Sequence, residues 1–351
     1  MGIGQVTALA RRPHSPRHGG PAAVLSGLGS YVPPHVVDND EIAERLRTSN
    51  EWIRSRTGIQ QRRVIDPGMS TSDLAVEAGQ RALKSANVES VDFVILATTT
   101  PDRPCPATAP EVASRIGLGG AAAFDLNAVC SGFLYALTTG AGLVESGVAN
   151  RVLVIGADTF STIINPACPT SAPIFGDGAG AVVLRAGEQH ELGALGPFDL
   201  GSDGEGAEMI MVPAGGSRQR ATGRPVEDRD RYFRMEGKKV FLRAITHMAK
   251  SAETVLDKAG LRLDDIDKFV YHQANARILY GVADRLGQPR GKFFSNIDMV
   301  GNTAAASVPI ALATANESGE LKVGHRVMLG AFGGGLTWGT TLVRWPEIEA
   351  L

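Results

Sequence analysis

The sequence predicts an α/β fold in which one α/β unit occurs twice, because apolar runs and helical patterns alternate in the same order in both halves. Strands that are continuous in Val, Ile and Leu and alternate with helices are typical of sheets covered on both faces. A boundary near residue 190 divides the chain into residues 23–190 and 191–351. Residues 1–22 contain Arg, His, Pro and Gly without a continuous apolar stretch, and we expect them to form a disordered extension.

The first matching element is an amphipathic helix followed by a short turn and a buried strand. It occupies residues 73–100, DLAVEAGQRALKSANVESVDFVILATTT, and recurs in residues 247–275, HMAKSAETVLDKAGLRLDDIDKFVYHQAN. In both segments apolar residues at helical spacing give way to a short run of aromatic and branched side chains. Each segment therefore predicts a helix followed by a strand.

The second matching element is a strand that runs into a helix start made of small residues. It is predicted in FDLNAVCSGF, residues 124–133, and in FSNIDMVGNTAAAS, residues 294–307. The helices that follow both end in Glu-Ser-Gly, and a shift of 172 residues carries Glu145 onto Glu317 and Cys130 onto Asn302. A further strand then follows in each half, in NRVLVIGAD and in HRVMLGAFGGG.

Residues 187–230 interrupt this pattern. Their Gly, Arg and Asp content predicts hairpins and a mobile surface excursion rather than a third domain.

The composition is that of an ordinary globular protein. The 351 residues are 43% hydrophobic and 21% charged, with a formal net charge of −2, which gives no reason to expect nucleic acid as a partner. Three cysteines, Cys105, Cys130 and Cys168, are too few and too scattered for a disulfide framework or a zinc site. No run of 18 apolar residues is present, so we expect no membrane span and a soluble, cytoplasmic protein.

Cys130 is the first candidate catalytic residue, because it stands where a predicted strand passes into a helix. Backbone N–H groups at a helix start carry partial positive charge, which stabilises a thiolate. The small residues Ser131 and Gly132 leave room for another group to approach. A buried cysteine is otherwise often an inert apolar residue.

His272 and Asn302 are the next candidates. His272 directly follows an apolar strand in FVYHQANARI, and the carboxyl ends of strands in open α/β sheets are where catalytic and binding groups collect. Asn302 stands in MVGNTAAAS, which is also a common turn sequence. The repeat places Asn302 opposite Cys130 and so favours a site shared between the two halves.

Two glycine-rich stretches follow or precede strands. AFGGGLTWG, residues 331–339, could offer backbone N–H groups to an oxyanion, whereas IFGDGAGAVVL is more simply a tight turn that leads into a strand. A dinucleotide fingerprint, a Walker motif and a metal-spaced histidine cluster are all absent from the sequence, so no cofactor or metal is expected.

Six segments together resemble the β-ketoacyl-ACP synthase III family, which primes fatty-acid and aromatic polyketide synthesis. They are NAVCSGF, HQANARI, GNTAAASVPIAL, IFGDGAGAVVL, EWIRSRTGI and AFGGGLTWG, and the resemblance covers about residues 23 to 346. It implies the thiolase fold, with two duplicated halves in a five-layer α-β-α-β-α sandwich, usually as a homodimer. The implied reaction is a decarboxylative Claisen condensation of an acyl primer with malonyl-ACP, without a cofactor.

The resemblance also implies roles for individual residues. Cys130 matches the nucleophile, His272 and Asn302 match the pair that binds the thioester carbonyl of the extender unit, and Gly334 matches a loop glycine whose N–H forms an oxyanion hole with that of Cys130. Positions that match substrate-binding residues are Trp52, Arg56, Cys105, Phe241 and Asn275. Arg277 matches a basic residue that docks acyl carrier protein.

Two positions depart from the family pattern. Pro169 stands where relatives that use acyl-CoA often have an arginine that stacks on the adenine. Cys105 stands where acetyl-specific relatives have a bulky aromatic residue, so we expect a deeper acyl pocket and a primer of short to medium length.

Three other functions remain compatible with parts of this pattern. A papain-type cysteine hydrolase uses Cys, His and Asn in the same chain order, although a CGSCW-like segment is absent. A same-fold acyltransferase would move the primer to an amine or hydroxyl without condensation. A non-catalytic partner subunit would have no need of Cys130, His272 and Asn302 together.

Overall fold

A computed structural model describes residues 21–351, and the expected disordered extension falls almost wholly outside the described residues. The first sheet has five strands in the order β1-β7-β6-β4-β5. They are β1 (Pro21–Tyr31), β4 (Phe93–Ala97), β5 (Ala122–Leu126), β6 (Arg151–Asp158) and β7 (Gly178–Glu188). β4 is parallel to β5 and β6, whereas β7 is antiparallel to β6 and β1. Because β1 begins at Pro21, the sheet starts two residues before the expected boundary at 23.

The second sheet repeats this plan with one strand fewer, in the order β11-β12-β13-β8. Its strands are β8 (Leu195–Ser202), β11 (Lys268–Tyr271), β12 (Arg326–Gly333) and β13 (Thr337–Arg344). β11 is parallel to β12, and β13 is antiparallel to both β12 and β8. The expectation that residues 187–230 form only a surface excursion is wrong at β8, which is an edge strand of this sheet.

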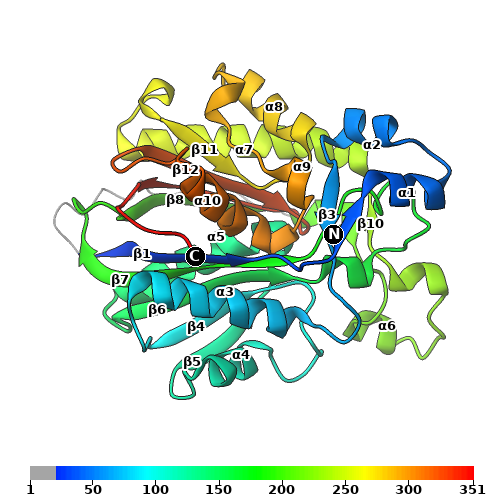
Figure 1. Cartoon of the computed structure of the whole chain (residues 1–351), viewed down its shortest axis with the longest axis horizontal. Helices are drawn as coiled ribbons and strands as arrows, with labels where there is room; N and C mark the ends of the chain where they lie inside the picture. Colours follow the sequence, from blue (N-terminus) through cyan, green and yellow to red (C-terminus); the bar gives the residue numbers. More distant parts are fainter. Residues whose placement is uncertain (1–20) are drawn as a thin grey trace, which may run out of the picture.

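Helices fill three layers around the two sheets (Figure 1). α3 (Thr71–Ala86) and α4 (Ala109–Ile116) cover the outer face of the first sheet, and α7 (Gly237–Ala259) and α8 (Ala276–Arg285) cover the second. α5 (Gly132–Glu145) and α10 (Ser307–Glu317) lie between the sheets. The five-layer α-β-α-β-α arrangement with duplicated halves is therefore confirmed.

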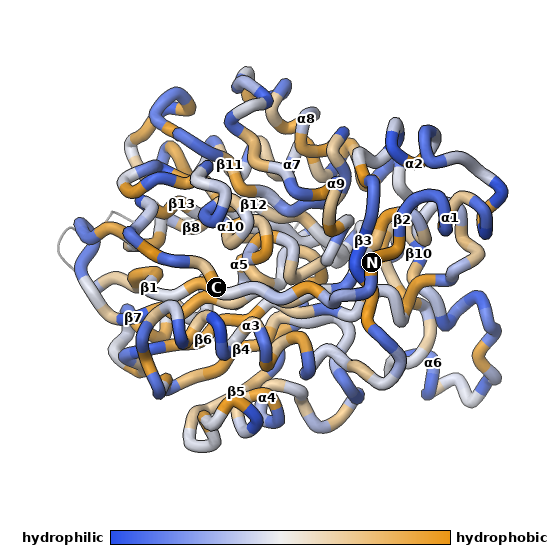
Figure 2. Tube along the Cα trace, in the orientation of Figure 1, coloured by the Kyte–Doolittle hydropathy of each residue, from blue (hydrophilic) through white to orange (hydrophobic). Residues whose placement is uncertain are grey.

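Neighbouring segments pack closely against the central helices α5 and α10. Most residues of α5 and α10 are buried, and many are Gly, Ala, Ser or Thr. A Cβ added at Gly156 of β6 would lie 2.4 Å from the carbonyl oxygen of Ala305, which precedes α10. The two halves therefore meet through small residues, with the apolar strands on either side visible in Figure 2.

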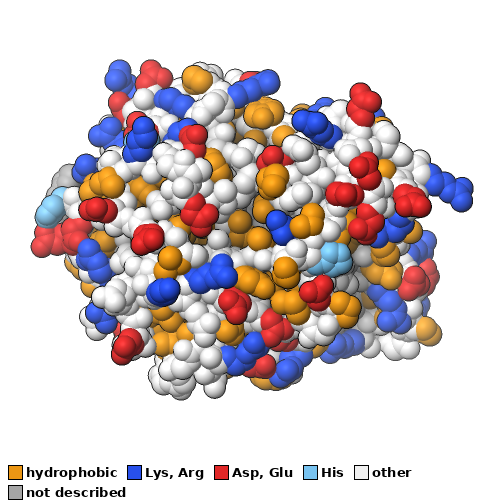
Figure 3. Space-filling view, viewed as in Figure 1, with side chains coloured by type: hydrophobic (Ala, Val, Ile, Leu, Met, Phe, Trp, Pro, Cys, Tyr) orange, Lys and Arg blue, Asp and Glu red, His pale blue; other side chains and the backbone are white. Residues whose placement is uncertain are grey.

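The remaining elements are short and lie mostly at one end of the molecule (Figure 1). They are β2 (Val36–Asp38), α1 (Asn39–Leu46), α2 (Asn50–Thr57), β3 (Gln61–Arg63), β9 (Ile210–Met211), α6 (Ser217–Arg220), β10 (Arg234–Met235) and α9 (Ile297–Val300). On the face in Figure 3, basic and acidic side chains are interspersed. No helix in residues 21–351 has the length and apolar character needed to cross a membrane.

The structure corrects how the two halves align. A shift of 175 residues, not 172, carries β6 onto β12 and the start of α5 onto the start of α10. α10 has 11 residues and α5 has 14, so the two Glu-Ser-Gly motifs align three residues out of step. The structural counterpart of Cys130 is therefore Ala305, and that of Asn302 is Asn127.

The strand expected at the start of residues 294–307 is also wrong. Phe293 forms one isolated parallel bridge with Phe269 of β11, and the chain then turns into α9. This bridge occupies the edge position that β5 takes in the first sheet.

Candidate active site

A cavity of about 330 Å³ brings Cys130, His272 and Asn302 together. Its other walls are largely apolar and include Ile174, Phe175, Val240, Ala244 and Met248. Among residues 21–351, no group of three or more His, Cys, Asp or Glu side chains is arranged to hold a metal ion. The cavity is thus a mainly apolar site with a few converging polar groups, the usual character of a small-molecule site.

Cys130 sits on a strained turn between β5 and α5. The preceding residue, Val129, has φ 48°, a conformation that a β-branched side chain rarely adopts. Asn127 Oδ1 accepts a hydrogen bond from Val129 N at 3.1 Å, and Ser131 Oγ donates to Ala128 O at 2.8 Å. These contacts hold the turn that presents the thiol to the cavity.

Gly333, at the end of β12, lies against the backbone of Cys130. An added Cβ there would be 2.7 Å from Cys130 N and 3.0 Å from Ser131 N. Only glycine therefore lets this strand end approach the first N–H groups of the helix start. The expected oxyanion-hole residue Gly334 follows directly, between the side chains of Val129 and Ile210.

In the unliganded protein, burial works against the thiolate that the helix start is expected to favour. Burial raises the pKa of the Cys130 thiol far above its ordinary value, and the negative charge of Asp158 raises it further. Cys130 as a residue is only 9% exposed. Both effects favour the protonated thiol, so a nearby proton acceptor would assist its attack on a thioester.

Asp158 is a fully buried carboxylate at the end of β6. Its Oδ1 accepts from Thr99 N at 2.8 Å and from Thr100 Oγ1 at 2.8 Å, and its Oδ2 accepts from Ala305 N at 2.9 Å. Burial raises its pKa to about 6, although these hydrogen bonds favour the charged form. Asp158 therefore anchors the start of the second half's central helix.

His272 follows β11, as the sequence predicts. Its backbone N donates to Gly330 O at 2.7 Å, and its carbonyl oxygen accepts from Ala274 N at 2.9 Å. Burial lowers the pKa of the imidazole to about 3, and Nδ1 is buried without a partner among the described residues. His272 is thus a neutral imidazole, which can accept one proton and donate another.

Asn302 is oriented by the backbone that follows it. Its Oδ1 accepts from Ala304 N at 3.0 Å, and its own N donates to Ile174 O at 2.9 Å. Because the amide oxygen is occupied, the NH₂ group is the part of the side chain left to act as a donor. The role implied by the family resemblance, donation to a thioester oxygen, fits this orientation.

Phe241 and Asn275, to which the family resemblance assigns substrate binding, also line the cavity. Asn275 caps α8 by accepting from Arg277 N at 2.8 Å, and its Nδ2 donates to Arg56 O at 3.1 Å. The guanidinium of Arg56 lies 4.7 Å from the Trp52 ring centroid. Asn275 therefore links the cavity wall to α2, whose residues Trp52 and Arg56 the family resemblance assigns to substrate binding.

Arg277 lies beside the cavity rather than in it. Its guanidinium stands over the Phe241 ring at 5.8 Å, at the start of α8. Pro169 is exposed and immediately precedes Thr170, a residue that lines the cavity. The position expected to hold an adenine-stacking arginine is therefore near the cavity but carries no cation.

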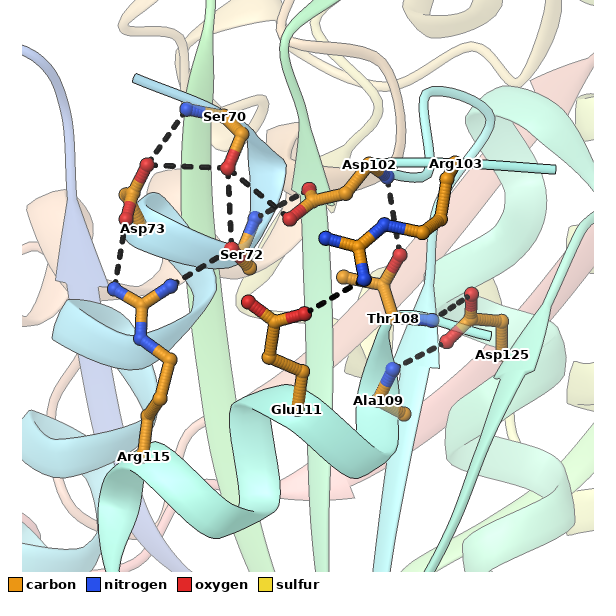
Figure 4. Close-up of polar contacts among 10 residues, drawn as sticks. All are labelled: Ser70, Ser72, Asp73, Asp102, Arg103, Thr108, Ala109, Glu111, Arg115 and Asp125. Atoms are coloured by element: carbon orange, nitrogen blue, oxygen red, sulfur yellow. Dashed lines mark hydrogen bonds and ion pairs between the residues drawn. The ribbon is translucent and has the colours of Figure 1, made fainter. Parts of the chain in front are cut away.

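The structure does not bring Cys105 to this cavity. Cys105 is exposed. The loop between Asp102 and Thr108 that carries it is pinned at both ends by the contacts drawn in Figure 4. Asp102 Oδ1 accepts from Ser72 N at 3.0 Å, and Asp102 N donates to Thr108 Oγ1 at 3.1 Å. Thr108 N in turn donates to Asp125 Oδ2 at 2.8 Å. The loop is thus held at both ends, with Cys105 outside the lining of the Cys130 cavity.

A second, larger cavity of about 810 Å³ adjoins the first. It is lined by Pro104, next to Cys105, and it shares Ile210 and Phe233 with the Cys130 cavity. Phe233 packs edge-on against Phe160 and Phe175, each with centroids 5.1 Å apart. These aromatic rings form the wall between the two cavities.

Sequence reasoning missed several residues that shape the site. Gly333 was hidden within a run of three glycines, and only the backbone geometry distinguishes it from its neighbours. Asp158 belongs to no recognisable motif, and its position at the end of a predicted strand was the one signal that could have identified it. Ile210, Phe233 and Lys238 lie between β8 and the first turn of α7, outside the segments that repeat in the sequence.

Comparison with known proteins gives two family matches. Residues 124–204 match the family 3-oxoacyl-[acyl-carrier-protein (ACP)] synthase III, and residues 256–345 match its C-terminal family. A β-ketoacyl-[acyl-carrier-protein] synthase III of Streptomyces coelicolor is 58% identical over 93% of this chain and 98% of its own length. A Pseudomonas aeruginosa synthase III is 50% identical over 93% of this chain and 98% of its own.

Solved structures agree with these matches. The crystal structure of 3-oxoacyl-(acyl carrier protein) synthase III from Pseudomonas aeruginosa PAO1 has TM-score 0.88 and 49% identity, covering 93% of this chain and 99% of that one. The priming β-ketosynthase from the R1128 polyketide pathway has TM-score 0.86 and 33% identity, covering 95% and 98%. Since the likeness extends over nearly the whole chain in sequence and in fold, this protein belongs to the β-ketoacyl-ACP synthase III family of condensing acyltransferases, which prime fatty-acid or polyketide synthesis.

Proposed function

We propose that Cys130 carries the acyl primer and that His272 and Asn302 serve the condensation with malonyl-ACP. The observation that supports this most is the single cavity in which a thiol, a neutral imidazole and an oriented amide converge. Splitting one carbon–carbon bond formation into acylation and condensation makes each step easier.

In the first step, Cys130 Sγ attacks the carbonyl carbon of the primer thioester. The thiol proton passes to the neutral imidazole of His272 and then to the departing thiol, so that one S–C bond forms and one breaks. The N–H groups of Cys130 and Gly334 would hold the oxyanion. The closeness of β12 to the Cys130 backbone supports this assignment.

In the second step, malonyl-ACP loses CO₂ and the electron pair passes into an enolate. N–H groups of His272 and Asn302 would donate to its oxygen, and the carbanion then attacks the acyl carbon on Cys130. The product is a β-ketoacyl-ACP, and the S–C bond breaks to release Cys130 as a thiolate, which takes up a proton from solvent. The apolar walls of the cavity would limit quenching of the carbanion by water.

The test is an intact-mass measurement of acyl-enzyme, followed by product analysis with and without malonyl-ACP. Wild type should gain one acyl group, and Cys130→Ala should gain none. A full adduct on Cys130→Ala would refute the nucleophile assignment. Acylation without a β-ketoacyl product would instead indicate transfer to an amine or hydroxyl.

We further propose a homodimer in which the Cys105 loop of each copy enters the large cavity of the other. Cys105 is exposed, its loop is rigidly held, and the large cavity adjoins the site of acylation. Cys105 would then shape the acyl pocket across the subunit boundary, with a primer of about four to eight carbons. Sedimentation velocity tests the dimer.

The primer could feed fatty-acid or polyketide synthesis. The R1128 relative is a polyketide priming ketosynthase by its description, and the Pseudomonas relative is a synthase III without that restriction. Product analysis with carrier proteins from each kind of pathway would separate the two.

A further inference from the structure

Lys238 is the single Lys, Arg, Asp or Glu among the described residues that line the Cys130 cavity. It stands in the first turn of α7, where the helix begins at Gly237. Lys238 is exposed, whereas Cys130 is buried, so the cavity extends from the thiol to a lysine at the surface. One positive charge therefore marks the outer end of an otherwise uncharged lining.

The charge of Lys238 is not neutralised within the described residues. The neighbouring Lys239 Nζ lies 2.6 Å from Glu236 Oε2, and Arg243 lies 2.6 Å from Asp203 Oδ2. No ion pair of Lys238 occurs in residues 21–351, and the adjacent acidic residue Glu236 is already paired. The N-terminal end of a 23-residue helix adds further positive potential at this place.

We propose that Lys238 binds the phosphate of the phosphopantetheine arm that carries the acyl group. This rests on the proposed function, in which thioesters of CoA and of carrier protein enter the cavity. Both carry the same arm, with the thioester at one end and a phosphate at the other. A thioester at Cys130 leaves the phosphate toward the surface, where Lys238 supplies the counter-charge.

A phosphate contact at Lys238 is also consistent with the lack of a positively charged side chain at Pro169. A phosphate contact is shared by CoA and carrier-protein substrates, whereas an adenine contact serves CoA alone. Lys238 is thus a binding residue for both substrates and has no part in bond making.

The experiment compares acetyl- and butyryl-pantetheine with their 4′-phosphates as primers in single-turnover acylation of Cys130. For Lys238→Ala, we expect half-saturating concentrations of the phosphorylated primers to rise about fivefold, with those of the unphosphorylated primers unchanged. Lys238→Arg should restore most of the loss, and added salt should shrink the difference. Lys239→Ala is the matched control and should behave as wild type.

Three outcomes would overturn the proposal. Equal weakening of phosphorylated and unphosphorylated primers would mean a structural role, and no weakening of either would mean no role. An effect with CoA thioesters but none with malonyl-ACP would place the contact on the nucleotide instead. If wild-type protein forms no acyl-enzyme with any thioester, the proposed function itself fails, and the phosphate site fails with it.

Discussion

Asp158 Oδ2 accepts a hydrogen bond from Ala305 N at 2.9 Å, and Ala305 is the structural counterpart of Cys130 in the second half. The shift of 175 residues that relates the halves carries Asp158 onto Gly333. At the helix start of the second half, the N–H group of Ala305 therefore donates to the carboxylate of Asp158. In the first, a glycine without a side chain leaves the equivalent N–H of Cys130 open.

With the oxyanion hole that we propose at Cys130, this asymmetry accounts for one such site in a duplicated fold rather than two. The carboxylate oxygen of Asp158 lies where the oxygen of a tetrahedral intermediate would lie in the other half. Both turns are strained in the same way, with φ 48° at Val129 and 47° at Ala304. The backbone is thus shared, and the residue at the strand end, Asp158 or Gly333, decides whether the N–H of the helix start is occupied or open.

Gly333→Ala should abolish most acylation. The added Cβ would lie 2.7 Å from Cys130 N, so the strand must move or the N–H must turn away. Loss of one such donor costs about 10²–10³ in rate, and we expect acylation to fall at least about 10²-fold. Single-turnover mass spectrometry measures it. Gly120→Ala, where an added Cβ meets nothing within 4 Å, is the control and should be unaffected. Acylation within threefold of wild type would contradict the oxyanion assignment.

Asn302→Ala should impair condensation far more than acylation, by roughly 10² or more, since the two steps use different donors. Its counterpart Asn127 supplies a matched variant, because each side chain accepts from the N–H of a residue with positive φ. Asn127→Ala should weaken both steps together, since it loosens the turn of Cys130. Parallel measurement of acylation and β-ketoacyl formation separates these effects. Equal loss of both steps in Asn302→Ala would count against this division.

The sequence predicts the duplicated α/β plan because strands and helices of this fold bury continuous apolar faces, which the residue pattern records. It also places Cys130, His272 and Asn302, because each stands at a strand end or helix start. The register of the repeat could not be predicted from Glu-Ser-Gly, because α10 is three residues shorter than α5. The role of Gly333 and the outward position of Cys105 could not be predicted either, because both depend on distances between segments that are far apart in the sequence.

His272 should make stability depend on pH. Its pKa in the folded protein is lowered to about 3, below the ordinary 6.5, so the unfolded chain takes up the proton first as pH falls. The stability due to neutral His272 is present above pH 6.5 and is lost as pH falls from 6.5 toward 3. Relative to pH 8, the free energy of unfolding at pH 5 should fall by about 2 kcal/mol more in wild type than in His272→Gln.

Urea unfolding at the two pH values measures this difference. Protonation of Asp158, whose pKa is raised to about 6, opposes the trend but is common to both proteins. Identical pH dependence in wild type and His272→Gln would show that His272 is not held neutral by burial.

Arg277→Glu should raise the KM for malonyl-ACP with little effect on acylation by a CoA thioester. Carrier proteins are acidic, and an arginine beside the cavity contributes mainly to encounter and orientation. Steady-state kinetics with malonyl-ACP measures the change. Lys322→Glu makes the same charge reversal before β12, at the end of that strand away from Gly333, and should leave the KM unchanged. If both variants raise the KM for malonyl-ACP alike, the effect comes from the net charge of the protein, and Arg277 is not a specific docking residue.

Cys105→Phe should shift the primer preference of the enzyme toward acetyl. Wild type should prefer about four to eight carbons, because three or four buried methylenes favour a longer primer by roughly 2–3 kcal/mol before ordering costs. A phenylalanine ring would fill that space, whereas Cys105→Ser keeps the side chain small and should retain the wild-type preference. The measurement is kcat/KM for acetyl, butyryl, hexanoyl and octanoyl primers. Preference for acetyl in wild type, unchanged in Cys105→Phe, would refute the pocket argument.

A mixed dimer decides which chain's Cys105 acts, since Cys105 is exposed and does not line the Cys130 cavity of its own chain. One copy carries Cys130→Ala together with Cys105→Phe, and the other is wild type, so only the wild-type copy can be acylated. If the loop enters the neighbouring copy, the active site meets the introduced ring and prefers acetyl. If the loop acts within its own chain, the active site keeps its cysteine and still prefers the longer primers, which would exclude the exchange of loops between copies.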